Sequence, residues 1–402
     1  MINIIGLGYI GLPTALIFSS KGIEVVGTDY NDKLVSKLNS GNVTFEEKGL
    51  ISLYREAKTK GIKFTDKYQQ ADIYIIAVPT PYNKFSKIID PSYVINATKS
   101  AIDICNDGAI IIIESTISPG TIDRFIRPLI KQSKKTVHLV HAPERIIPGN
   151  MVYELAHNSR TIGADTTSIG EKVAFLYKKI TDGDVVVTDI KTAEMTKVVE
   201  NTFRAVNIAF ANELAKICRH DDMDVYEIIR ICNMHPRVNI LNPGPGVGGH
   251  CIPVDPWFLV GDYPSLTKVI RDSLEVNESM PEYVLSRIMD IMKENKLKDI
   301  FRVGIYGLTY KENVDDYRES PSIQLLESQA KHLAEPLKAY DPWVKTQITK
   351  NQYFDLESFL NEVDLVVVMV KHDEIRINDS RLSNKIVFDT QNIVKSGKIY
   401  KL

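Results

Sequence analysis

The stretch Asn3-Ile-Ile-Gly6-Leu-Gly8-Tyr-Ile-Gly11 opens the sequence and decides its fold. A short apolar run followed by G-x-G-x-x-G predicts a β-strand, a tight turn and the start of a helix. Gly6 permits the turn, Gly8 lets a diphosphate approach the backbone, and Gly11 allows the helix to pack closely on the strand. A purely structural glycine turn is the alternative, so the meaning of the motif depends on what surrounds it.

Asp29 supplies the second part of this pattern. It ends the predicted strand at residues 24–28, about 20 residues after the glycines, where a carboxylate can accept hydrogen bonds from an adenosine ribose. The same carboxylate would repel a 2′-phosphate, so the sequence favours NAD over NADP. The amino terminus of the first helix presents free N–H groups to the pyrophosphate.

The rest of the chain divides into three parts. Strand-like and helical patterns alternate up to about residue 190, which predicts a parallel sheet covered on both faces. Helical periodicity then dominates at 192–219 and 266–294, around a Pro- and Gly-rich loop at 233–262. From residue 299 a second α/β pattern begins, and Gly304-Ile-Tyr-Gly-Leu-Thr-Tyr310 echoes the opening stretch.

We therefore predict an α/β protein with two Rossmann-like doubly wound domains, joined by a central helical domain that contains a long helix. The predicted boundaries are 1–190 for the NAD-binding domain, 191–296 for the helical and dimerisation domain, and 297–402 for the C-terminal domain. An ordinary core helix is the alternative to a dimerisation role for the helix at 192–219.

Composition narrows the class of protein. The 402 residues are 44% apolar and 25% charged, as in globular domains that bury a large core. The net charge of −2 gives no general attraction to nucleic acid or an anionic membrane. The apolar runs are too short to span a bilayer. The four cysteines form no C-x-x-C pair, which favours reduced thiols in a cytoplasmic enzyme without a metal site.

Cys251 differs from the other cysteines because it lies in the glycine-rich loop Gly244–Pro256. If Cys251 begins a helix, the helix amino terminus would stabilise its thiolate. A thiolate can attack an aldehyde to form a thiohemiacetal, and oxidation then gives a thioester that water can cleave. We expected the neighbouring glycines to clear space around the thiol. A structural cysteine is the alternative.

Polar residues at three strand ends and on one helix complete the candidate site. Ligands bind beyond the carboxyl ends of parallel strands, where Thr80, Thr116 and Glu144 are predicted to lie. Each Thr has a strand-capping role as an equal alternative, whereas Glu144 is a candidate base for activating water. Lys197 and Asn201, with Arg204, share a face of the predicted helix and could donate hydrogen bonds to a developing alkoxide. A solvated helix face is the alternative.

Together these motifs resemble the UDP-glucose/GDP-mannose dehydrogenase family along nearly the whole chain. The motifs that carry the resemblance are 6–11, 78–81, 114–116, 143–145, 197–201, 246–255, 307–311 and 318–321. The resemblance implies oxidation of a sugar C6 alcohol to a carboxylate with two NAD, a C-terminal domain that binds UDP, and a dimer formed through the central helix. It implies that Cys251 is the nucleophile and is paired with Asp255, that Lys197 and Asn201 stabilise the oxyanion, and that Thr116 and Glu144 hold or activate water.

Two details resemble the branch that acts on N-acetylated sugars. Val254 stands where UDP-glucose dehydrogenases usually have Lys, and the segments 235–240 and 200–204 are similar to UDP-N-acetyl-D-mannosamine dehydrogenases. In that branch the residues matching His235 and Arg237 reach the substrate from the partner subunit. The full set of residues expected to bind substrate is Arg145, Ile146, Lys197, Asn201, Arg204, His235, Arg237, Asn239, Gly248, Tyr310 and Lys311. The full set expected to bind NAD is Gly6, Gly8, Tyr9, Ile10, Gly11, Asp29, Pro79, Thr80, Thr116 and Arg318.

The leading interpretation is thus a homodimeric dehydrogenase for a UDP-N-acetyl-sugar that supplies a surface polysaccharide precursor. The same chemistry on UDP-GlcNAc or UDP-glucose is the nearest alternative. A single-step β-hydroxyacid dehydrogenase and a nucleotide-sugar sensor without activity are alternatives from other classes. Lys311 stands where the first turn has a helix-opening glycine, so the second Rossmann-like unit is expected to take phosphate rather than NAD.

Overall fold

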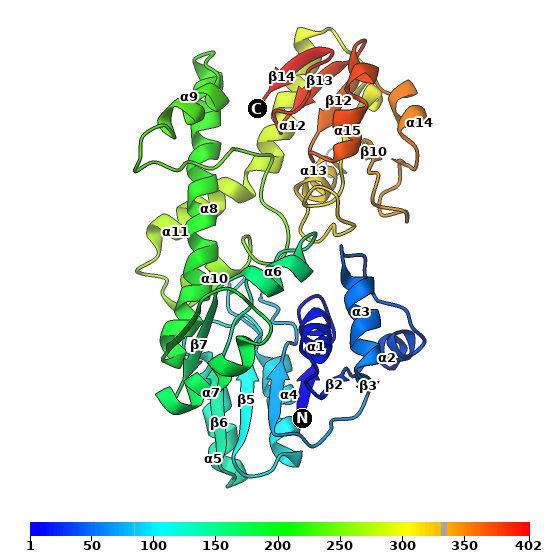
Figure 1. Cartoon of the computed structure of the whole chain (residues 1–402). Coiled ribbons are helices and arrows are strands. Elements are labelled where there is room, and N and C mark those ends of the chain that lie inside the picture. The colour runs from blue at the N-terminus through cyan, green and yellow to red at the C-terminus, as the bar shows by residue number, and fades with distance from the viewer. Residues whose placement is uncertain (84, 331–335) are drawn as a thin grey trace. The chain divides into compact units, whose positions relative to one another are not determined.

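The computed structural model describes residues 1–83, 85–330 and 336–402 and contains two compact units. The first unit is Met1–Glu200 and the second is Asn201–Leu402 (Figure 1). Each unit is built on its own sheet, which confirms the predicted α/β fold class. The three-domain division of the sequence stays a prediction.

The N-terminal unit has an eight-stranded sheet of order β3-β2-β1-β4-β5-β6-β7-β8. Its strands are β1 (Ile2–Ile5), β2 (Val25–Thr28), β3 (Lys63–Thr65), β4 (Ile73–Ile76), β5 (Ala109–Ile113), β6 (Val137–His141), β7 (Arg160–Ala164) and β8 (Val185–Thr188). The first six follow the dinucleotide-binding order, with the reversal between β1 and β4. The predicted parallel sheet is present, with one difference: β6 and β7 pair antiparallel, whereas all other neighbours pair in parallel.

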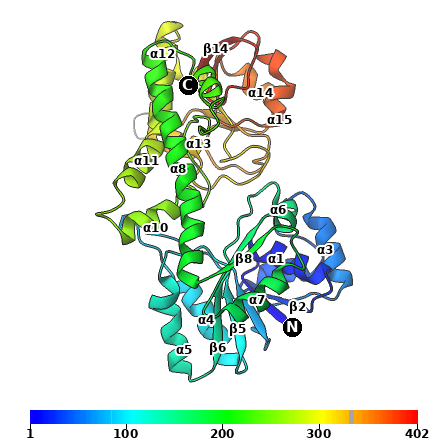
Figure 2. The same cartoon turned by 60° about the vertical axis from the view of Figure 1, so that its left-hand side comes forward.

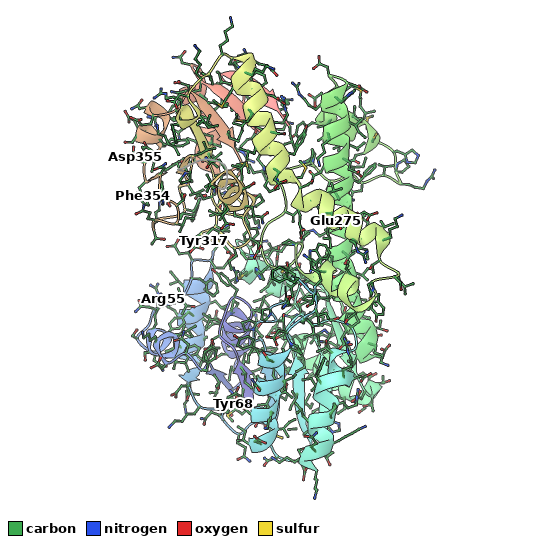
Figure 3. The ribbon with its side chains drawn as sticks, turned by 180° about the vertical axis from the view of Figure 1, so that it is seen from behind. Arg55, Tyr68, Glu275, Tyr317, Phe354 and Asp355 are labelled. Carbon is green, nitrogen blue, oxygen red and sulfur yellow. The ribbon has the colours of Figure 1, made fainter. Side chains whose placement is uncertain are left out.

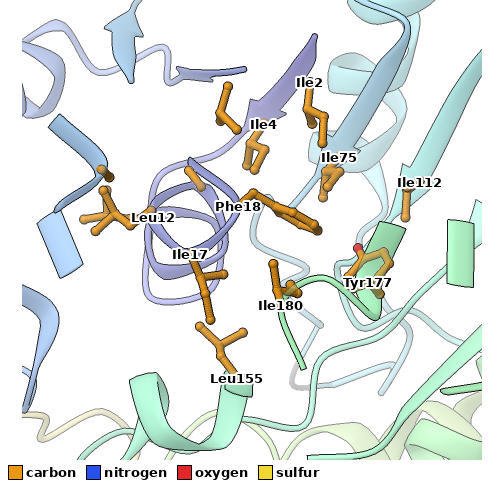
Figure 4. Packing of buried hydrophobic residues seen from close by; sticks show 14 of the residues in the cluster. Ile2, Ile4, Leu12, Ile17, Phe18, Ile75, Ile112, Leu155, Tyr177 and Ile180 are labelled. Atoms are coloured by element: carbon orange, nitrogen blue, oxygen red, sulfur yellow. The ribbon is translucent and has the colours of Figure 1, made fainter. Parts of the chain in front are cut away.

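Helices cover both faces of this sheet. They are α1 (Gly11–Ser20), α2 (Asp32–Asn39), α3 (Leu50–Thr59), α4 (Ser92–Ile104), α5 (Arg127–Ser133), α6 (Met151–His157) and α7 (Thr167–Tyr177). The helices α1 and α7 lie on one face and α4 and α5 on the other (Figure 2). Every residue of α1 is buried, and Phe18 meets the ring of Tyr177 edge-on at 5.4 Å between centroids (Figure 4). This packing fixes the turn that precedes α1.

The C-terminal unit repeats the topology with six parallel strands in the order β11-β10-β9-β12-β13-β14. They are β9 (Val303–Tyr306), β10 (Lys338–Tyr340), β11 (Gln352–Tyr353), β12 (Leu365–Val368), β13 (Ile386–Asp389) and β14 (Lys398–Lys401). Counted from its own first strand, this is the order of the first six strands of the N-terminal sheet. The internal echo in the sequence therefore corresponds to a repeated fold.

Helices precede, cover and connect the strands of this unit. They are α8 (Ile190–His220), whose sequence crosses the boundary between the units, α9 (Val225–Cys232), α10 (Asp255–Asp262), α11 (Lys268–Glu278), α12 (Met280–Glu294), α13 (Pro321–Ala330), α14 (Leu356–Asn361) and α15 (Asp373–Ile377). The side chain of Asp355 accepts a hydrogen bond from Ser358 N and so caps α14 (Figure 3).

Two of the helical predictions were wrong in detail. The helix expected at 266–294 is two helices, because α11 ends at Glu278 and α12 restarts with Pro281 in its first turn. Proline is favoured there since its missing N–H needs no partner in a first turn. The region 233–262, expected as a loop, contains α10, which begins at Asp255.

Candidate active site

The first βα turn holds its carboxylate by backbone hydrogen bonds. Gly6 adopts a φ of 90°, a region that favours glycine, and its N–H donates to Thr28 O at 2.8 Å. Asp29 accepts from Leu7 N at 2.8 Å through Oδ2 and from Asn31 N at 2.9 Å through Oδ1. These bonds fix the direction of the Asp29 carboxylate at the end of β2.

The three glycines of the motif differ in what surrounds them. A Cβ on Gly11 would lie 1.8 Å from Gly6 O, and a Cβ on Gly6 would lie 2.6 Å from Ala77 O, so the protein itself requires both glycines. Gly8 has no other protein atom within 4 Å of a Cβ position. The backbone at Gly8 is open, as the approach of a pyrophosphate requires, and α1 begins at Gly11 just beyond it. These residues fit NAD.

Three strand ends meet at the same sheet edge. The register pairs Ile5 with Ile76 and Ile76 with Ile113, so the segments that follow β1, β4 and β5 are neighbours. The hydroxyl of Ser115 donates to Val78 O at 2.7 Å and ties two of these segments together. The predicted NAD ligands at these ends are Pro79, which is exposed, and Thr80 and Thr116, which are partly buried. Near the glycines, Tyr9 packs on Phe45 with 4.4 Å between ring centroids, and Ile10 directly precedes α1.

Glu144 and its two neighbours follow β6. The carboxylate of Glu144 accepts from Arg145 N at 2.7 Å and is 6% exposed as a residue. The side chain of Ile146 is buried in the hydrophobic core of the N-terminal unit, which leaves it little surface to offer a substrate.

Arg145 was expected to bind substrate, but the structure gives it partners within the chain. Its guanidinium donates to both carboxylate oxygens of Glu200, at 2.9 and 2.5 Å, and to Ser159 and Thr161. These bonds occupy all five donors of the guanidinium. Arg145 therefore ties the segment after β6 to α8, and its direct contact with substrate stays a prediction.

Asparagines of α8 fasten the loop that leads to Cys251. Asn207 donates to Asn239 O at 2.8 Å and accepts from Leu241 N at 2.9 Å. Asn212, which is fully buried, accepts from Gly244 N at 2.9 Å. Each amide satisfies backbone groups that an irregular loop would otherwise leave unpaired. The loop is thereby fixed against α8 at two points before it reaches the cysteine.

Cys251 lies in the turn that starts α10. Its carbonyl accepts from Val254 N at 3.1 Å and from Asp255 N at 2.8 Å, the second being an α-helical bond. The helix α10 itself begins at Asp255, so Cys251 lies four residues before its first residue and does not begin the helix. Asp255 is 3% exposed, and its carboxylate accepts from the Asn201 amide at 2.7 Å. Cys251 is partly exposed as a residue, unlike the buried Cys105 and Cys218.

Two glycines before Cys251 allow the loop to pack closely on another segment of the chain. A Cβ on Gly248 would lie 2.6 Å from Tyr310 Cβ and 2.8 Å from Glu319 O, and a Cβ on Gly249 would lie 2.9 Å from the Tyr310 ring. Gly249 N also donates to Arg318 O at 3.0 Å. The loop is thus packed on the segment 310–321, and the expectation that its glycines clear space around the thiol stays a prediction.

The other predicted substrate residues lie on α8 and in two segments of the C-terminal unit. Lys197 is buried at 8% exposure, whereas Arg204 is exposed on the same helix. His235, Arg237 and Asn239 are exposed.

The last two predicted ligands follow β9. Lys311 is partly buried, and its carbonyl accepts from the Thr309 hydroxyl at 2.9 Å. Arg318, predicted to contact NAD, donates to the Asp316 carboxylate at 2.6 Å. Their contacts with ligand stay predictions.

The first βα turn has a second copy in the C-terminal unit. Gly307 has a φ of 92° and donates to Tyr340 O at 2.8 Å, and Leu308 N donates to Asp341 at 2.6 Å, as in the first copy. Here, however, His372 Nε2 lies 3.1 Å from the same carboxylate, and both side chains are fully buried. Asn313 N donates to His372 Nδ1, so the ring proton is on Nε2 and faces Asp341. The carboxylate is therefore closed off by a histidine.

Sequence reasoning missed a buried ionic cluster in the N-terminal unit, formed by Glu114, Glu144, Arg160 and Tyr177. The sequence contained only a weak signal for this cluster. Two carboxylates that follow buried strands need a nearby cation, and Arg160 is the first residue of the short strand β7.

Two absences hold for the described part of the chain. Among residues 1–83, 85–330 and 336–402, no helix is both long and apolar enough to cross a bilayer. Over the same ranges, no group of three or more His, Cys, Asp or Glu side chains has the arrangement of a metal site.

Comparison with protein families gives three matches in chain order. The NAD binding domain of the UDP-glucose/GDP-mannose dehydrogenase family matches residues 1–181, its central domain matches 191–279, and its UDP binding domain matches 304–396. A UDP-N-acetyl-D-mannosamine dehydrogenase from Methanocaldococcus jannaschii is 41% identical, over 98% of this chain and 92% of that protein.

Two further similarities extend over nearly the full length. An NDP-N-acetyl-D-galactosaminuronic acid dehydrogenase from Ralstonia nicotianae is 38% identical over 99% of this chain and 97% of that protein. The solved structure of a UDP-N-acetyl-mannosamine dehydrogenase from Staphylococcus aureus superposes with a TM-score of 0.89 at 39% identity, over 100% of this chain and 97% of that one. The chain therefore belongs to the UDP-glucose/GDP-mannose dehydrogenase family and is an NAD-dependent UDP-sugar dehydrogenase of that family.

Proposed function

We propose that this enzyme is a UDP-N-acetyl-D-mannosamine 6-dehydrogenase, which converts the sugar C6 alcohol to a carboxylate in two oxidations. The observation that carries the proposal is the turn at Cys251. Cys251 is a partly exposed residue in the turn before α10, and the buried Asp255 begins that helix four residues on and is bonded to Asn201. A thiol that can form a thioester is what a dehydrogenase needs to proceed from aldehyde to acid.

The residues divide the chemistry between them. The Cys251 thiolate attacks the aldehyde carbon to form a thiohemiacetal, and the second oxidation converts this to a thioester. Lys197 and the second amide hydrogen of Asn201 donate to the oxygen that becomes negative at this carbon. Glu144 takes a proton from the water that cleaves the thioester, and Thr116 holds that water. The turn at Gly6, Gly8 and Asp29 would hold NAD, which when bound would supply the hydride acceptor for both oxidations, so we expect two NADH per sugar.

The choice of N-acetylmannosamine rests on the sequence and on the relatives. Val254, 8% exposed in the turn before α10, stands where UDP-glucose dehydrogenases usually have Lys. Full-length relatives about 40% identical are UDP-N-acetyl-D-mannosamine dehydrogenases. The 38% identity to an NDP-N-acetyl-D-galactosaminuronic acid dehydrogenase makes an N-acetylated galactosamine sugar the second candidate. The uronate product suits a surface polysaccharide.

We also propose a homodimer formed through α8. Val199, Phe203, Phe210 and Ile217 are 46%, 63%, 49% and 55% exposed, and the last three recur every seven residues. This set, the α8 apolar stripe, has the spacing of helices that pair side by side. A second copy on the stripe is the assembly that the resemblance implies, with the exposed His235 and Arg237 reaching the partner's substrate.

The test is a panel of nucleotide sugars with the purified enzyme. UDP-N-acetylmannosamine should be used with the highest kcat/KM, with two NADH and one uronate formed per sugar. A preference for UDP-glucose, UDP-GlcNAc or the galactosamine sugar would overturn the substrate assignment alone. One NADH per substrate would point to single-step dehydrogenase chemistry. No NADH with any sugar would point to a sensor.

A further inference from the structure

A buried ionic cluster lies behind the carboxylate that we propose as the hydrolytic base. Arg160, at the start of β7, donates through Nη1 to Glu114 at 2.9 Å and through Nη2 to Glu144. The side chains of Glu114, Glu144 and Arg160 are 0%, 4% and 2% exposed. The Tyr177 hydroxyl donates to Glu114 at 3.1 Å, and the guanidinium lies 4.6 Å from the Tyr177 ring centroid.

The charges in this cluster do not balance when both carboxylates are ionised. One guanidinium, which stays protonated, then faces two negative charges in a buried site. Burial raises the pKa of Glu114 to about 7, and Glu144 adds to this effect while Arg160 opposes it. The Oε2 atom of Glu114 makes no hydrogen bond among the described residues, so a proton there disturbs no existing contact.

Glu144 is held from two sides. Its Oε1 accepts from Arg145 N at 2.7 Å and its Oε2 accepts from Arg160. Arg145 is itself fastened to Glu200 of α8. A carboxylate that removes a proton from water needs both a fixed direction and a basicity suited to the working pH.

We propose that Arg160 is the positioning residue of Glu144 and that Glu114 sets how tightly Arg160 holds it. When Glu114 carries a proton, Glu144 is the only negative partner of the guanidinium and is held tightly. When Glu114 is ionised, the two carboxylates share the guanidinium, so Glu144 is held less tightly and is more available to water. This inference deepens the proposed function, because it rests on Glu144 acting in thioester hydrolysis.

The step that Glu114 and Arg160 influence is the last one. Glu144 takes a proton from water, the resulting hydroxyl adds to the thioester carbonyl, and the carbon–sulfur bond breaks to return Cys251 as a thiolate. The titratable and charged groups that act on Glu114 are Arg160, Glu144 and Tyr177. Glu114 ionises over the neutral range, so hydrolysis should accelerate as pH rises from about 6 to about 8.

Glu114→Gln tests this directly, since the amide keeps an oxygen for Arg160 and Tyr177 but cannot ionise. We expect hydrolysis in this variant to lose its rise across neutral pH and to be about three- to tenfold slower at pH 8. The acyl-enzyme should accumulate, visible as a burst of two NADH per active site and as a thioester adduct in intact-protein mass spectrometry. The rate of the first NADH and the KM for the sugar should not change.

Glu374→Gln is the matched control, because Glu374 likewise accepts hydrogen bonds from tyrosine hydroxyls, those of Tyr306 and Tyr340. Its pH profile should keep the wild-type shape.

Arg160→Lys, which keeps the charge but not the bidentate geometry, should also accumulate acyl-enzyme. Circular dichroism identifies any variant that fails to fold. A Glu114→Gln profile parallel to wild type would overturn the inference. If Glu144→Gln itself leaves hydrolysis unchanged, the proposed role of Glu144 is what fails.

Discussion

The side-chain amide of Asn201 donates a 2.7 Å hydrogen bond to the carboxylate of Asp255, and both groups are buried. The bond joins α8 to the first residue of α10, four positions after Cys251. It therefore links the nucleophile's turn to the helix that carries the proposed oxyanion donors. Removing this bond should therefore disturb both the turn at Cys251 and the position of Asn201 on α8.

Asn201→Ala removes one donor from a buried carboxylate and should lower the free energy of unfolding by about 1–3 kcal/mol. The kcat should fall more than tenfold, because the variant also loses an oxyanion donor. Urea unfolding and steady-state kinetics measure the two effects. Asn207→Ala, which loses loop bonds at a less buried site, should change stability with little change in kcat; equal kcat losses in both variants would contradict the special role of Asn201.

Cys251→Ala should abolish uronate formation, with kcat reduced by at least about a thousandfold, because no thioester can form. Product mass spectrometry and NADH counting measure this loss. Cys232→Ala changes another exposed cysteine and should keep wild-type stoichiometry. Undiminished carboxylate production by the Cys251 variant would disprove covalent catalysis. Cys251→Ser is a useful second variant, since its ester should hydrolyse slowly and be trapped.

Asp29→Asn removes the negative charge that two backbone N–H groups hold at the end of β2. The KM for NAD should rise about 10- to 100-fold, the equivalent of one charged hydrogen bond, and discrimination against NADP should weaken. Kinetics with both dinucleotides give the ratio. Asp32→Asn, in the first turn of α2, is the control. An unchanged NAD-to-NADP ratio would mean that Asp29 does not contact the ribose.

Because His141 is buried, we expect the folded protein to lose stability in mild acid. Burial lowers its pKa from 6.5 to about 4, against the opposing effect of its bond to Ile113 O. As pH falls from 6.5 to 4, the unfolded chain takes up a proton that the folded chain refuses, so stability falls by on the order of 3 kcal/mol. His141→Gln should lose less stability over this window in urea titrations. His220→Gln, at a side chain 87% exposed, should behave like wild type; matching slopes for all three proteins would refute the prediction.

Phe210→Glu tests the α8 apolar stripe. A charge in the middle of a dimer interface costs far more than the same charge in water, so the variant should sediment as a monomer at micromolar concentration. Phe175→Glu, at another exposed phenylalanine, on α7, should leave the assembly unchanged. A wild-type protein that sediments as a monomer would remove the basis of the proposed dimer.

Sequence patterns predicted the central strands well for a physical reason. Strands buried on both faces must be continuously apolar, as in Ala109–Ile113 and Leu365–Val368, and such runs are visible without a structure. Other strands lack this signal. Lys63–Thr65 and Gln352–Tyr353 are short and partly exposed, and Arg160–Ala164 begins with a charged residue that is buried only because two carboxylates meet it.

The same difference between local patterns and long-range contacts applies to the candidate site. The spacing of Gly6, Gly8 and Gly11 and the position of Asp29 are local, so the sequence contained them. The packing of Gly248 on Tyr310 depends on residues far apart in the chain, and no periodicity reports it. The five bonds of Arg145 are of the same kind. Chemistry was therefore easier to predict than the contacts that hold each side chain.

The buried His372 beside Asp341 affects which of the two βα turns can bind the adenosine ribose of NAD. Both turns present a glycine at positive φ and an aspartate after the second strand, the features that select adenosine ribose. With His372 against Asp341, the duplicate cannot offer its carboxylate to that ribose. The two copies of the turn therefore differ at the carboxylate itself, since Asp29 accepts from Leu7 N and Asn31 N whereas Asp341 also faces a buried imidazole. This difference agrees with the family assignment, in which the first copy lies in the NAD binding domain and the second in the UDP binding domain.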